Sequence, residues 1–120
     1  MQKLLIFKPD LTPFDPQAVE RVFRTCGKFT AIRLNTPVGT IVECEYHDAD
    51  DWTIIRLSGN AETISMNYTT GASLQAALVI QKSLGVPLRM VDDDYNFDLT
   101  FSNIDSVEEL EAAIDNSPTS

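Results

Sequence analysis

A chain of 120 residues with 43% hydrophobic residues is long enough for one domain with its own core. It has 18 acidic residues against nine bases, a net charge of −9. This excess of acid argues against direct binding to nucleic acid, whose phosphates are neutralised by lysine and arginine. No apolar stretch approaches the ~20 residues that span a bilayer. We therefore expect a cytoplasmic protein with no membrane segment: one domain, residues 1–115, and a flexible tail, residues 116–120.

The first half of the chain predicts one helix among five strands. Residues 4–7 are a short apolar run typical of a buried strand. Asp15 and Pro16 are a favourable helix start, because aspartate caps free amides and proline suits the first helical position, and Gly27 ends that helix. Four strands are then expected in succession, separated by polar turns: residues 29–34, 40–46, 52–57 and 62–68.

The second half predicts two helices with a pair of strands between them. The first of these helices opens at residues 70–73 and ends at Gly85, and residues 88–91 form a short strand. Residues 95–101 alternate strictly between apolar and polar side chains, so we expect Tyr95, like the other aromatics of this strand, to face the core. Ser106 followed by Glu109 is a capping box that starts the last helix.

The predicted order of elements is β-α-β-β-β-β-α-β-β-α. Consecutive strands joined by short turns favour antiparallel pairing. We therefore expect an α+β fold, a two-layer sandwich in which helices cover one face of a mainly antiparallel sheet.

Patterns typical of catalytic sites do not occur in the sequence. The five glycines are widely separated, so no loop is suited to hold a phosphate, and no serine lies in a nucleophile elbow. Cys26 and Cys44 lack the spacing of a redox or zinc motif, and we expect buried thiols, although a disulfide between them stays open. We predict a protein that is not an enzyme and that holds no cofactor and no metal.

An alternative site is the turn His47–Asp51, which joins the only histidine to three aspartates. Imidazole and carboxylates can share a divalent ion, so this turn is a candidate for small-ligand or metal binding. A single imidazole lacks the paired spacing of zinc motifs, and aspartates are common in solvated turns.

Acidic residues are concentrated in the last quarter of the chain. Residues 1–89 contain nine acids and all nine bases, whereas residues 90–120 contain nine acids and no base. Favourable charges at a helix start explain some of these acids, but not three consecutive aspartates or a final helix without lysine. We predict an acidic surface that attracts a basic partner. The expected contact residues are Asp92, Asp93, Asp94, Asp98, Glu108 and Glu109.

The sequence thus favours a small, non-enzymatic acidic binding protein. In size and charge it resembles small acidic immunity proteins, which implies a partner that is a basic, nuclease-type toxin domain. The alternatives are a general protein-interaction domain, or a homodimer formed through a sheet edge or the Trp52 region, and a ligand-binding protein that uses the turn His47–Asp51.

Overall fold

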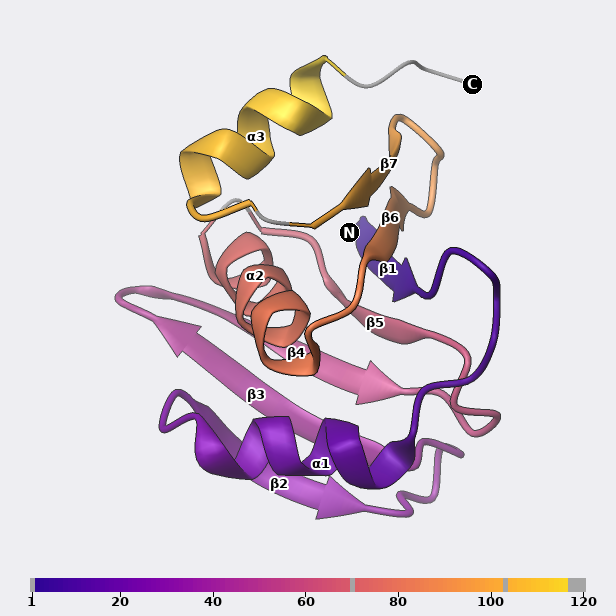
Figure 1. Cartoon of the computed structure of the whole chain (residues 1–120). Helices are drawn as coiled ribbons and strands as arrows, with labels where there is room; N and C mark the ends of the chain where they lie inside the picture. Colours follow the sequence, from indigo (N-terminus) through magenta and orange to yellow (C-terminus); the bar gives the residue numbers. More distant parts are fainter. Residues whose placement is uncertain (1, 70, 103, 117–120) are drawn as a thin grey trace.

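The computed structural model describes residues 2–69, 71–102 and 104–116 as one seven-stranded sheet and three helices (Figure 1). The elements are β1 (Lys3–Phe7), α1 (Pro16–Thr25), β2 (Phe29–Leu34), β3 (Val42–Asp48), β4 (Asp51–Leu57), β5 (Ile64–Asn67), α2 (Ala72–Leu84), β6 (Leu88–Asp92), β7 (Asp98–Phe101) and α3 (Val107–Asp115). This is the predicted order. Of the predicted tail, Asn116 caps the end of α3, and residues 117–120 lie outside the described residues.

Every strand pairing in the sheet is antiparallel. The strand order is β2-β3-β4-β5-β1-β6-β7, so the first strand of the chain lies between β5 and β6. Three successive hairpin connections join β2 to β5, as the short polar turns of the sequence predict. The predicted α+β class with a mainly antiparallel sheet is confirmed.

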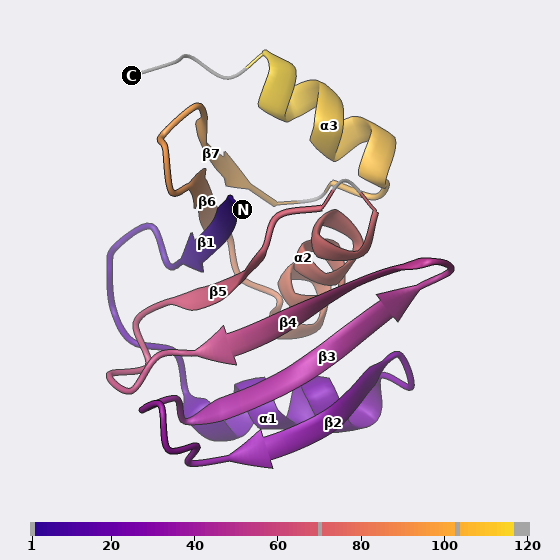
Figure 2. The ribbon, with the colours of Figure 1, turned by 180° about the vertical axis from the view of Figure 1, so that it is seen from behind.

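The three helices lie on the same side of the sheet. α1 packs on β2 and β3, α2 on β3 and β4, and α3 on α2 and β7. Seen from behind, β2 and β3 pass in front of α1, β4 passes in front of α2, and no described helix covers this side, which we call the open face (Figure 2). α2 lies between α1, α3 and the sheet, so it is buried on most sides.

Alternation along β3 shows how the sequence builds the core. Val42, Cys44 and Tyr46 are buried beneath the helices, and the intervening Glu43 and Glu45 lie on the open face. α1 starts where predicted, because the Asp15 side chain accepts a hydrogen bond from the Gln17 amide at 3.0 Å. Alternation along strands and caps at helix starts thus determine which face of each element is buried.

The prediction that Tyr95 faces the core is wrong. β7 begins only at Asp98, and Tyr95 lies in the turn before it, 57% exposed and with a φ of 54°. Asp92 causes this, because its carboxylate accepts hydrogen bonds from the Asn96 amide at 2.7 Å and from Asn96 Nδ2 at 2.8 Å. A side chain that bonds local backbone in this way competes with strand pairing.

Candidate functional site

The six predicted contact residues do not form one cluster. Asp93 and Asp94 are exposed in the turn between β6 and β7, whereas Glu108 and Glu109 are exposed in the first turn of α3. In Figure 1 this turn and the start of α3 lie on opposite sides of the molecule. A partner that touched all four would have to lie along the whole length of α3.

The other two predicted residues have structural partners. Asp92 is 1% exposed, and its carboxylate holds the β6–β7 turn through Asn96. Asp98 accepts two hydrogen bonds from the Arg89 guanidinium, one of them at 2.8 Å from Nε, and this pairing lowers its pKa. Neither carboxylate is therefore available as an unbalanced surface charge.

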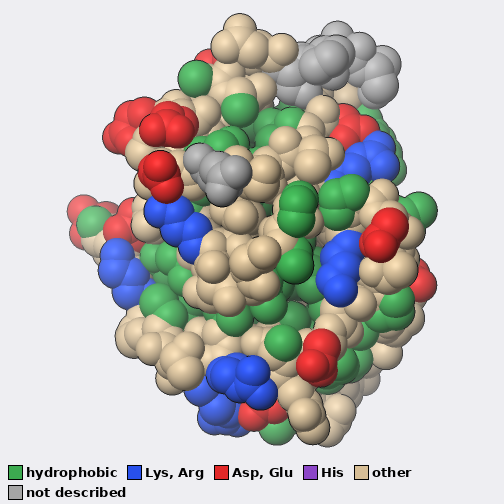
Figure 3. Space-filling view, in the orientation of Figure 1, with side chains coloured by type: hydrophobic (Ala, Val, Ile, Leu, Met, Phe, Trp, Pro, Cys, Tyr) green, Lys and Arg blue, Asp and Glu red, His purple; other side chains and the backbone are tan. Residues whose placement is uncertain are grey.

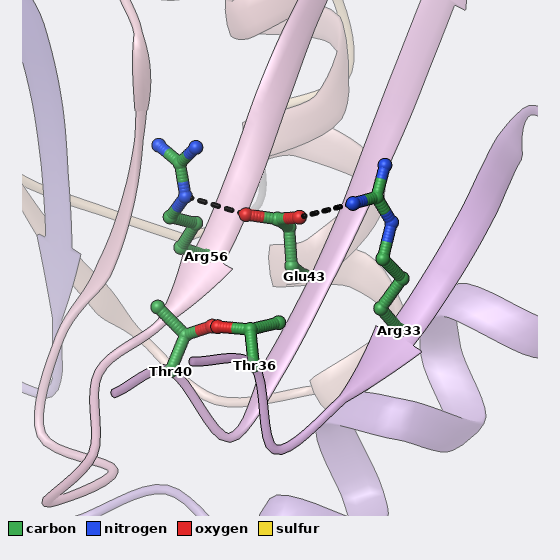
Figure 4. A network of polar contacts seen from close by, with 5 residues as sticks. All are labelled: Arg33, Thr36, Thr40, Glu43 and Arg56. Carbon is green, nitrogen blue, oxygen red and sulfur yellow. Dashed lines mark hydrogen bonds and ion pairs between the residues drawn. The ribbon is translucent and has the colours of Figure 1, made fainter. Parts of the chain in front are cut away.

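Three of the nine acids in residues 2–89 also have a lysine or arginine beside them. On the open face, Glu43 accepts a hydrogen bond from Arg56 Nε at 2.7 Å and lies 3.7 Å from Arg33 Nη1 (Figure 4). The three residues lie directly opposite one another on β2, β3 and β4. Further pairs are Glu20 with Arg24, Asp48 with Lys28, Glu45 with His47 and, from the acidic quarter, Asp105 with Lys82.

α3 lacks this balance. Its exposed acids are Glu108, Glu109, Glu111 and Asp115, and none of them takes part in an ion pair with any described residue. Figure 3 shows acidic side chains gathered over the start of α3, with lysine and arginine side chains directly below them and further ones over α1 and along the other edge of this face.

Asp115 differs from the predicted residues because it lies in the last turn of α3, and Glu111 lies one turn before it. The end of a helix carries partial negative charge, so a carboxylate there is unfavourable by about 0.3–1 kcal/mol. The last turn of α3 has no base to offset this charge. Two acids spaced i and i+4 also repel each other. The sequence contains the signal, an aspartate at a helix end without a lysine, but it becomes visible only once the end of α3 is known.

A hollow of about 330 Å³ lies beside the end of α3. Asp115 and Ile114 meet the β6–β7 turn and the start of β1 there, and the lining residues are Gln2, Tyr68, Asp92, Asn96, Phe97, Ile114 and Asp115. Gln2 donates a hydrogen bond to Asp94 Oδ2 at 3.1 Å, which places Asp94 at the same hollow. We call this hollow together with Asp93, Asp94, Glu111 and Asp115 the acidic end.

Tyr68 reports the electrostatic potential of the acidic end. Its ring packs edge-on against Phe97, with 6.0 Å between the centroids. Burial raises the pKa of the Tyr68 hydroxyl, and the negative charges of Asp92, Glu111 and Asp115 raise it further. Such a site favours a positively charged group that presents hydrogen-bond donors.

In the alternative site at His47–Asp51, the last residue, Asp51, has a structural role. Asp51 Oδ2 accepts a hydrogen bond from the Ala72 amide at 2.7 Å, so it caps the start of α2, and this bond lowers the pKa of Asp51. His47 bonds Glu45 at 3.1 Å and stacks on Trp52, with 6.1 Å between ring centroids. Within the described residues, no three histidine, cysteine or carboxylate side chains come together to hold a metal.

The two cysteines do not form a disulfide in the structure. Cys44 is buried, and burial raises the pKa of its thiol, so the reactive thiolate is rare at neutral pH. None of the described helices is both long and apolar enough to cross a membrane.

Comparisons with known proteins find no match for this chain among protein-family models, characterised proteins or solved structures. Its function is therefore argued from its own geometry.

Proposed function

We propose that this protein is a non-enzymatic, cytoplasmic binding protein that docks a basic protein on its acidic end. One observation carries the proposal: Glu111 and Asp115 are exposed and have no ion-pair partner among the described residues, and Asp115 lies in the last helical turn, which disfavours negative charge. Residues that are unfavourable for local stability are often retained because they serve a function.

A basic partner would relieve this unfavourable arrangement. A lysine or arginine at the hollow would offset the negative charges of the acids around Tyr68. The wider field of α3 would also attract such a partner and speed its association.

The most specific form of the proposal is an immunity protein that neutralises a nuclease-type toxin. A nuclease needs basic residues to hold phosphates, and an acidic surface can cover such a site in a one-to-one complex. The support is charge complementarity and small size. If the protein is such an immunity protein, its captured partner cleaves nucleic acid, and this nuclease activity is lost when an equimolar amount of the immunity protein is added.

Capture from an extract of the cells that make the protein tests the proposal. The bait is compared with two variants that lose the same charge: Glu111→Gln/Asp115→Asn at the acidic end and Asp50→Asn/Glu62→Gln at exposed positions elsewhere. We expect one basic protein in equimolar amount with the wild type and the second variant, but not with the first. Recovery of the same partner in equal amounts with all three baits would show that the partner does not bind at the acidic end.

A further inference from the structure

A second hollow, of about 260 Å³, lies where the loop after β1 meets the β6–β7 turn. Figure 2 shows this loop and this turn on the same side of the molecule. We call it the apolar hollow, because most of its lining is apolar: Leu5, Phe7, Leu11, Val91 and Tyr95. Glu62 lies at its rim, where its carboxylate accepts a hydrogen bond from Asn60 Nδ2 at 3.2 Å, and a glutamine there would preserve the shape of the rim.

The floor of the apolar hollow belongs to the open face of the sheet. Leu5 and Phe7 alternate with the core residues Leu4 and Ile6 along β1, so their side chains point away from the helices. Val91 of β6 is paired directly with Leu5 and therefore lies on the same face. No described helix covers these side chains, so a partner can approach them.

Leu11 and Tyr95 form two sides of the apolar hollow, and both are unusual. Leu11 is 62% exposed and Tyr95 is 57% exposed, so neither contributes mainly to the core. Their φ angles are 64° and 54°, a range that disfavours bulky side chains and that glycine or asparagine adopts at less cost. Two large apolar side chains are thus found where the local backbone favours others, and both line the same hollow. Contact with a partner would explain their presence.

The charges beside the apolar hollow indicate the chemistry of that partner. Asp93 and Asp94 directly precede Tyr95 and are exposed, and neither is in an ion pair with any described base. Arg89 lies 5.3 Å from the ring centroid of a lining phenylalanine, but it is already paired with Asp98. The unbalanced charge next to the hollow is therefore negative, and it complements a basic segment.

We propose that the apolar hollow takes an anchor residue, a phenylalanine or leucine, from a basic segment of the partner protein. This inference rests on the proposed function and extends it. The bases of the segment face Asp93 and Asp94 of the acidic end, and the anchor inserts between Leu11 and Tyr95. An apolar side chain seated in a pocket and surrounded by polar contacts is a common centre of binding energy in interfaces. The acids then speed association, and the anchor slows dissociation.

The test is a titration with three blocked peptides, followed by NMR through the methyl signals of Leu5, Leu11 and Val91. The peptides are Lys-Lys-Phe-Lys-Lys, Lys-Lys-Ala-Lys-Lys and Gly-Gly-Phe-Gly-Gly. We expect the first to shift these signals in a saturable manner and to bind about tenfold or more tightly than the second, as expected for burial of one large apolar side chain. The third lacks the bases and should also bind more weakly than the first. Equal binding of the first peptide and either of the others would overturn the proposal.

Leu11→Asn tests the hollow without disturbing the backbone, because asparagine tolerates a positive φ better than leucine does. We expect an unchanged or higher melting temperature, and a preference for phenylalanine over alanine that falls about threefold or more. Leu34→Asn replaces a leucine that is 45% exposed on β2, outside the hollow, and should keep the full preference. An undiminished preference in Leu11→Asn would overturn the proposal. So would a lower melting temperature, because Leu11 would then be retained for folding.

Glu111→Gln/Asp115→Asn distinguishes a failure of the apolar hollow from a failure of the proposed function. This variant should weaken both lysine peptides by the same factor and keep the preference for phenylalanine. If the wild type shows no preference but the variant binds both lysine peptides more weakly, the hollow is wrong and the acidic end stands. If the variant binds them like the wild type, the acidic end is wrong. Methyl shifts on dilution of the protein alone would mean that a second copy occupies the hollow, which would also overturn the proposal.

Discussion

At the scale of single residues, Tyr46 tests the description of the core. It is fully buried, its ring packs edge-on against Phe29 at 4.9 Å, and its hydroxyl has no hydrogen-bond partner among the described residues. Removal of an unsatisfied hydroxyl is close to neutral, so Tyr46→Phe should leave the free energy of unfolding unchanged or raise it by about 1 kcal/mol. Urea denaturation at neutral pH measures this change, and a loss of stability would show that the hydroxyl is bonded.

The burial of Tyr46 also predicts how the free energy of unfolding changes at alkaline pH. Burial raises the pKa of Tyr46 from 10.0 to about 12. The unfolded chain therefore ionises first, and the stability that Tyr46 contributes below pH 10 is lost as the pH rises through 12. Across this range the wild type should lose more stability than Tyr46→Phe, and parallel curves for the two proteins would contradict the burial of this hydroxyl.

Tyr68 tests the electrostatic description of the acidic end. Because Glu111 and Asp115 raise its pKa, Glu111→Gln/Asp115→Asn should lower the pKa of Tyr68 towards its ordinary value. Ultraviolet titration of the phenolate measures it, with Tyr68→Phe to identify the signal. Asp50→Asn/Glu62→Gln changes the net charge equally and should leave this pKa where it is. If both variants lower it alike, the effect belongs to net charge rather than to the acidic end.

At the scale of elements, the start of α2 depends on a residue 21 positions earlier. Gly71 has no side chain to cap the helix, and Asp51 supplies the cap through the Ala72 amide. Asp51→Ala should therefore cost about 1 kcal/mol of stability, as a lost helix cap does, and Asp50→Ala should cost almost none. Denaturant unfolding of the two variants measures the difference, and equal costs would contradict the cap.

The lowered pKa of Asp51 fixes the sign of a pH effect. The cap contributes stability above pH 3.8, the ordinary pKa of aspartate, and this contribution is lost as the pH falls through the lower value of the folded state. Stability curves for the wild type and Asp51→Ala should therefore converge in acid. A constant gap would mean that Asp51 acts through packing rather than charge.

Periodicity was sufficient to predict the elements but not their long-range contacts. Strict alternation identified the buried face of β3, and Asp15 with Pro16 identified the start of α1. Alternation failed at Tyr95, because the Asp92 side chain turns the chain before a strand can form. The Asp51 cap could not be foreseen either, since it joins residues that only the folded sheet brings together.

The acidic end could be predicted only in part from the sequence, because it too depends on contacts between distant segments. Sequence counts located the excess of acid in residues 90–120, which includes Asp93 and Asp94 of the acidic end. They could not show that Asp92 is buried, that Asp98 pairs with Arg89, or that Asp115 lies beside Tyr68. Each of these facts depends on contacts between distant segments.

At the scale of the whole molecule, the sheet edges bear on self-association. β2 and β7 form the two edges. The register of β2 shifts between Thr30 and Arg33, with Ala31 at a φ of 52°, and β7 has only four residues. Bulged or short edge strands resist pairing with another sheet. We therefore expect a monomer by sedimentation at micromolar concentrations, and a concentration-dependent dimer would favour the alternative of an assembly domain.

The central claim is that the acidic end binds a basic partner, and it predicts how affinity depends on charge and salt. The most direct measurement is the dissociation constant of the captured partner by titration calorimetry, at low and high salt, for the wild type and both charge variants. We expect Glu111→Gln/Asp115→Asn to bind at least about tenfold more weakly than Asp50→Asn/Glu62→Gln at low salt, with the gap narrowing at high salt. Equal affinities for the two variants would show that the acids of α3 are solvated surface and that the partner binds elsewhere.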